Sequence, residues 1–113
     1  MNLEQTAYKQ LLTDAFDRYT RIHTESDFHS KSYPSTERQK DLSQLLTREL
    51  KEMGVDAQMD ENGYVYGKIP ANTEKNVPKI FFCSHVDTSP DCSGKDVIPR
   101  IHENYQGQDI LYP

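Results

Sequence analysis

Apolar side chains recur every three or four positions near the N-terminus, which is the spacing that places them on one side of a helix. They are Leu3, Ala7, Tyr8, Leu11, Leu12, Ala15, Phe16, Tyr19 and Ile22. This pattern predicts an amphipathic helix over residues 3–22. The next segment, His23–Tyr33, is polar, and its Ser, Thr and Asp side chains bond to their own backbone more readily outside a helix. We expect it to be a long loop.

A second helix is predicted after Pro34. Ser35 or Thr36 can cap its first turn, and Thr36 and Gln39 have the spacing of a capping box. Its buried side is expected to consist of Leu42, Leu45, Leu46, Leu50 and Met53. Gly54 stands where a left-handed C-terminal cap is wanted, so the helix should end there.

A β-hairpin is predicted next. Val55, Ala57 and Met59 alternate with polar residues, residues 60–63 (DENG) suit a turn, and Tyr64–Ile69 is rich in residues that favour strands.

The run Ile80–Ser84 is almost wholly apolar, which favours a strand buried on both faces in the middle of an α/β sheet. From His85 to Pro113 the sequence has no helical period and little alternation. A central strand needs neighbouring strands and a covering helix, and no downstream pattern predicts them. We therefore expect an α/β fold with an incomplete sheet, made of two helices, a β-hairpin and a buried central strand.

Composition narrows the function classes. The chain has 113 residues, which suits one domain, and its 35% of apolar residues predicts a thin core. A net charge of -5 argues against a nucleic-acid partner. The longest apolar run is far too short to span a membrane, and the polar start lacks the basic and apolar regions of a signal peptide. With two cysteines, expected to be reduced, we predict a cytoplasmic protein.

The candidate chemistry lies in Ser84–Asp91, where the expected strand passes into a loop, because ligands bind at such edges of open α/β sheets. Side chains two positions apart on an extended chain point to the same side, so His85 and Asp87 should lie together. An imidazole whose second nitrogen is held by a carboxylate is a good zinc ligand. The alternative is structural, with Asp87 capping a turn beside a hydrogen-bonded histidine, and spacing alone favours it.

The sequence gives weaker support to a catalytic cysteine and to further metal-binding histidines. Cys83 could act as a nucleophile with His85 as its base, but a cysteine inside an apolar run is more simply an inert buried thiol. The remaining histidines, His23, His29 and His102, lack ligand-like spacing and are expected to be solvated loop residues.

Longer motifs carry a resemblance to a known family. Ser84–Lys95 (SHVDTSPDCSGK) resembles the SHVDTSPDxSGK segment of the peptidase T family, the tripeptide aminopeptidases among the two-zinc exopeptidases. Pro34–Glu37 (PSTE), Asn62–Tyr66 (NGYVY) and Glu103–Ile110 (ENYQGQDI) are similar to further segments of that family. The four segments occur in the family's order, and the resemblance covers about Tyr19–Ile110.

The resemblance implies a zinc aminopeptidase that removes the N-terminal residue of tripeptides with metal-activated water. In that family His85 would bind one zinc, and Asp87 would be the catalytic aspartate that orients it. The complete site holds two zinc ions, and the other ligands and the base glutamate lie beyond the matching segments. We therefore expect residues 1–113 to be the N-terminal part of the catalytic domain, without its lid or dimerisation domain and inactive alone, because a catalytic zinc needs about three protein ligands.

A second hypothesis comes from a different class. The chain could be a free-standing, non-catalytic α/β module that binds a partner, or a second copy of itself, through the uncovered strand Ile80–Ser84.

Overall fold

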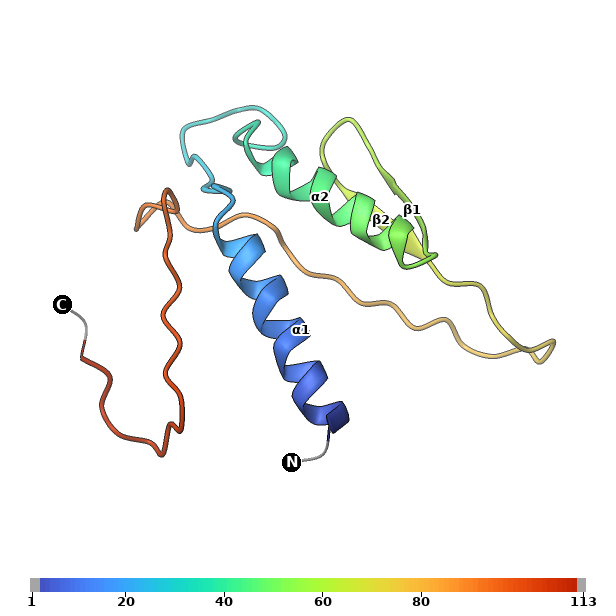
Figure 1. Ribbon diagram of the computed structural model, residues 1–113. Helices are drawn as coiled ribbons and strands as arrows, with labels where there is room; N and C mark the ends of the chain where they lie inside the picture. Colours follow the sequence, from blue (N-terminus) through green and yellow to red (C-terminus); the bar gives the residue numbers. More distant parts are fainter. Residues whose placement is uncertain (1–2, 112–113) are drawn as a thin grey trace.

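The computed structural model of the protein describes residues 3–111. Two helices and one hairpin follow each other along this part of the chain, and Figure 1 shows long extended segments after them. The elements are α1 (Leu3–Thr20), α2 (Gln39–Glu52), β1 (Asp56–Met59) and β2 (Val65–Lys68). The predicted helices and hairpin are therefore confirmed, with changes at their ends. No helix within residues 3–111 is long and apolar enough to cross a membrane.

Helix α1 ends at Thr20, two residues earlier than its apolar spacing predicts. Its apolar side is largely open to solvent, since Leu11 and Phe16 are 64% and 63% exposed. The link to α2 is polar: the Tyr19 hydroxyl and the Arg18 guanidinium both bond to the carboxylate of Glu49, the latter at 3.0 Å. In Figure 1, α1 lies apart from the unit formed by α2 and the hairpin.

Helix α2 begins at Gln39, later than predicted, and its N-cap residue Arg38 makes no side-chain cap. The expected capping groups are used elsewhere. The Thr36 hydroxyl donates to the carbonyl of Glu25 at 2.8 Å. The side-chain amide of Gln39 donates to the hydroxyls of Ser35 and Thr36, each at 3.1 Å. The polar residues before α2 therefore join it to the preceding loop.

The core lies between α2 and the hairpin. Leu42 and Ala57 are its buried apolar residues, at 8% and 5% exposed. The other leucines of α2 are partly buried, whereas Met53 is 70% exposed, so its predicted burial is wrong. Met53 is the C-cap residue and lies just beyond the last residue of α2.

Gly54 ends α2 in the left-handed conformation, with φ of 81°, as the sequence predicts. The Val55 amide then donates to the Leu50 carbonyl at 2.9 Å, which closes the last turn. The hairpin pairs β1 with β2 antiparallel, with Asp56 opposite Lys68.

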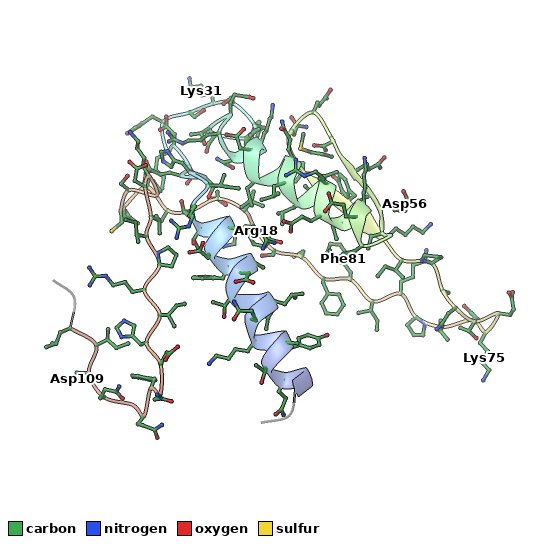
Figure 2. All side chains as sticks on the ribbon, in the orientation of Figure 1. Arg18, Lys31, Asp56, Lys75, Phe81 and Asp109 are labelled. Atoms are coloured by element: carbon green, nitrogen blue, oxygen red, sulfur yellow. The ribbon has the colours of Figure 1, made fainter. Side chains whose placement is uncertain are left out.

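The predicted buried strand Ile80–Ser84 is wrong for the described part of the chain. Its residues are extended but belong to no sheet, and Phe81 and Phe82 are 85% and 88% exposed. Cys83 is exposed as well, so its expected burial is also wrong. A strand requires backbone partners, and no other segment of residues 3–111 pairs with this run. Figure 2 shows Phe81 on this unpaired stretch.

Candidate functional site

His85 and Asp87 contact each other. The Nδ1 atom of His85 lies 3.0 Å from Oδ1 of Asp87, so the extended backbone brings both side chains to one side, as their spacing predicts. The histidine side chain is 83% exposed and the aspartate side chain is 40% exposed. A carboxylate accepts hydrogen bonds, so a neutral ring must carry its proton on Nδ1. The lone pair is then on Nε2, the nitrogen on the side of the ring away from Asp87.

The residue after this pair is anchored by the long loop. Thr88 and Glu25 form a parallel bridge, in which the Thr88 amide donates to Thr24 at 3.2 Å and the Ser26 amide donates to the Thr88 carbonyl at 3.0 Å. The Ser26 hydroxyl reaches the same carbonyl at 3.1 Å. Thr24 is only 2% exposed. The segment His23–Tyr33 is a loop, as predicted, and its first part holds the chain beside Asp87.

Glu25 makes a second connection with its side chain. Its carboxylate accepts the Gly94 amide at 2.9 Å, and His23 and Arg38 lie 3.3 Å and 3.8 Å from it. Its backbone carbonyl accepts the Thr36 hydroxyl and, at 3.1 Å, the Arg38 guanidinium. The Gly94 amide, then the hydrogen bond with His23, holds the pKa of the Glu25 carboxyl below its usual value. Glu25 thus joins three segments of the chain.

Gly94 lies close to the same bridge. A Cβ at this position would be 2.9 Å from the hydroxyl oxygen of Thr88 and 3.7 Å from Cβ of Glu25. Between these residues, the Ser89 hydroxyl donates to Asp91 at 2.6 Å and forms a local turn. Gly94 therefore lies close to Thr88 and Glu25, whereas most residues between Thr88 and Gly94 are exposed.

The structure brings some candidate residues together and leaves others apart. His85 and Asp87 are adjacent, whereas His29 and His102 are exposed loop residues, as expected. His23 is only 27% exposed and bonds to Glu25, so its description as a solvated residue is wrong.

Sequence reasoning missed Thr24 and Glu25. Their only signal was the length of the loop between the helices, which exceeds the usual two to about eight residues of such connections.

The chemistry of His85 and Asp87 suits one ligand of a zinc site and the carboxylate that holds that ligand. A histidine whose Nδ1 faces a carboxylate has the arrangement that most zinc-binding histidines share. A catalytic zinc needs about three protein ligands, and within residues 3–111 no three His, Cys, Asp or Glu side chains come close enough to hold a metal. The described residues thus bring together one histidine and one carboxylate in this arrangement.

Known proteins were compared with the chain. No protein-family model matches it. It is 48% identical to peptidase T of Bacillus pumilus over 103 residues and 52% identical to that of Alkaliphilus oremlandii, matches that cover 90% and 88% of the chain. The chain resembles the N-terminal part of peptidase T. Peptidase T of Geobacillus thermodenitrificans is 48% identical over 91% of the chain.

The chain spans about a quarter of the length of these peptidase T relatives, since 25% of each is matched. About nine tenths of the chain takes part in the match, so both the loop at Glu25 and the segment from His85 to Gly94 lie within it. The aligned stretch therefore spans the residues of the candidate site.

Proposed function

We propose that the chain is the N-terminal part of a zinc-dependent aminopeptidase that releases the N-terminal residue of tripeptides. The observation that carries the proposal is the identity of 48–52% to proteins named peptidase T, over nine tenths of the chain. The paired His85 and Asp87 side chains support it from the structure, because their contact suits a zinc ligand and its orienting carboxylate.

The two residues have distinct roles in this proposal. His85 would hold one zinc ion through Nε2. Asp87, the catalytic aspartate, would accept a hydrogen bond from the Nδ1–H group, which fixes the tautomer and the direction of the ring. When bound, zinc activates water and polarises the scissile carbonyl at neutral pH.

The proposed parent protein supplies the rest of the site. Its complete centre holds two zinc ions, and residues 1–113 contribute one ligand. The remaining ligands, the base and a lid or dimerisation domain would belong to the longer protein. We therefore expect the chain alone to be inactive. Both cysteines are free and exposed, which suits a reducing compartment such as the cytoplasm.

The test compares zinc content and tripeptide hydrolysis for two proteins, the 113-residue chain and a protein extended to the length of its relatives. We expect turnover and bound zinc in the long protein and neither in the short one. His85→Ala should abolish turnover in the long protein, whereas the matched control His102→Ala, at an exposed loop position, should not.

Two results would contradict the proposal. An inactive long protein would refute the peptidase assignment. Tight stoichiometric zinc and turnover in the short chain would refute its dependence on later residues.

A further inference from the structure

The chain on the two sides of the His85–Asp87 pair differs in how it is held. Before the pair, Ile80, Phe81 and Phe82 are more than 80% exposed and belong to no sheet. After it, the backbone of Thr88 bonds to the loop through both its amide and its carbonyl. The direction in which the pair points is therefore set from its C-terminal side.

Glu25 is at the centre of this anchor. Its neighbours Thr24 and Ser26 bond to Thr88, which directly follows Asp87. Its carboxylate bonds to the Gly94 amide and so fixes the far end of the same segment. The backbones of Thr24 and Ser26 thus hold one end of residues 88–94, and the Glu25 carboxylate between them holds the other end.

Glu25 is itself held from the other side. The Thr36 hydroxyl and the Arg38 guanidinium donate to its carbonyl, just before α2 begins. Helix α2 is in turn packed on the hairpin, and its residue Leu42 is buried. The anchor therefore rests on the best-packed part of the described chain.

We propose that Glu25 is a positioning residue for the His85–Asp87 pair, a role that rests on the proposed peptidase function. Its carboxylate acts through Gly94, at the far end of the segment that Thr24 and Ser26 hold at Thr88, and it keeps the Asp87 carboxylate facing Nδ1 of His85. The lowered pKa of its carboxyl means that this group stays ionised at neutral pH and acts as a strong acceptor for the Gly94 amide.

The test uses three variants of the 113-residue chain. Glu25→Ala removes the acceptor for the Gly94 amide. Glu25→Gln keeps an oxygen in reach of that amide and loses only the charge. The matched control is Glu37→Gln, which removes the same charge from a nearby glutamate whose side chain is 76% exposed and pairs with Lys40.

Nitrogen-15 NMR of the His85 ring reports the tautomer directly. In the unaltered chain and in the control, we expect the neutral ring to carry its proton mainly on Nδ1. In Glu25→Ala, the Nε2-protonated tautomer should rise severalfold, and hydrogen exchange at the Gly94 amide should speed up by roughly tenfold or more. Glu25→Gln should restore most of both signals, whereas a residue of merely local structural importance would not affect the His85 tautomer.

A further variant disturbs the contact between Glu25 and Gly94 from the side of Gly94. Gly94→Ala leaves Glu25 intact, but its Cβ would meet the Thr88 hydroxyl at 2.9 Å, so either the Thr88 side chain or the segment must shift. We expect the same change of His85 tautomer. If Glu25→Ala folds and leaves the tautomer unchanged, or if Gly94→Ala does so, the proposal is overturned.

Activity of the longer protein separates this proposal from the peptidase assignment. Glu25→Ala should lower kcat by roughly tenfold or more with little change in KM, as loss of support behind a metal ligand does. If the long protein is active and its kcat is unchanged by Glu25→Ala, the positioning role alone is overturned. A long protein without activity would overturn the peptidase assignment, and the His85 tautomer would still decide what Glu25 does.

Discussion

The carboxylate of Asp87 determines which nitrogen of His85 carries the proton. At 3.0 Å from Nδ1 it favours the tautomer whose lone pair is on Nε2, the form that can bind a metal. Both side chains are exposed, so nothing else within the described residues fixes the ring as directly. A single substitution at residue 87 therefore tests the proposed role of the pair.

Asp87→Ala in the longer protein should reduce tripeptide turnover by roughly 10–100-fold, because the ligand loses the group that orients it. Steady-state hydrolysis and zinc content measure this. The control is Asp91→Ala, which removes a nearby carboxylate that bonds only to Ser89 among the described contacts, and its turnover should stay within about twofold. Equal losses in the two variants would contradict a specific role for Asp87.

Glu49 gives a prediction for pH. The Tyr19 hydroxyl, and after it Arg18, hold the pKa of Glu49 below its usual value. A carboxyl whose pKa is lower in the folded state stabilises the fold above its unfolded pKa of about 4.3 and loses that contribution as the pH falls through the folded value.

Glu49→Gln should therefore lower the free energy of unfolding at pH 6 by about 1 kcal/mol or less. The difference from the unaltered chain should shrink progressively below about pH 4.3. Thermal unfolding followed by circular dichroism measures both. Glu52→Gln, at an exposed position of the same helix, should show no such pH dependence. A difference that persists unchanged in acid would show that Glu49 acts through packing rather than charge.

Among the elements, α2 and the hairpin form the packed unit, and the turn between them depends on Gly54. Its φ of 81° lies in the left-handed region, which a side chain makes costly. A Cβ there would meet no atom within 4 Å, so the cost of a substitution is that of the backbone alone.

Gly54→Ala should destabilise the chain by roughly 1 kcal/mol, and Gly54→Asn should cost less, because asparagine tolerates this conformation better. Urea unfolding of the two variants beside the unaltered chain provides the measurement. Equal stability of the alanine and asparagine variants would contradict a purely conformational cost.

For the whole molecule, the main feature is apolar surface without a cover. Phe81 and Phe82 stand out along the extended run, and Leu11 and Phe16 are exposed on α1. Exposed apolar side chains of this size favour association with another surface. In the proposed parent, later parts of the peptidase would cover it.

The 113-residue chain alone should therefore self-associate as its concentration rises, and Phe81→Ser combined with Phe82→Ser should reduce this. Light scattering across a concentration series measures the association. The control is Phe28→Ser, which replaces a residue 75% exposed that stands between two polar neighbours. A chain that stays monomeric at all concentrations would contradict the expectation.

Some features of the fold can be predicted from the sequence and others cannot. The apolar period of α2, its end at Gly54 and the alternation of the hairpin are local patterns, and the structure confirms them. The predicted start of α2 is wrong because Thr36 bonds to Glu25 instead of capping the helix. The predicted strand at Ile80–Ser84 is wrong because a strand exists only with a partner, which composition cannot supply.

The helices, the hairpin and the same-side placement of His85 and Asp87 follow from local sequence, because each depends on neighbours within a few residues. The contact between Glu25 and Gly94, which lie 69 positions apart, belongs to the folded chain alone. A contact between residues so distant leaves no periodic signal in the chain, since it arises only when the loop and the segment after Asp87 fold against each other.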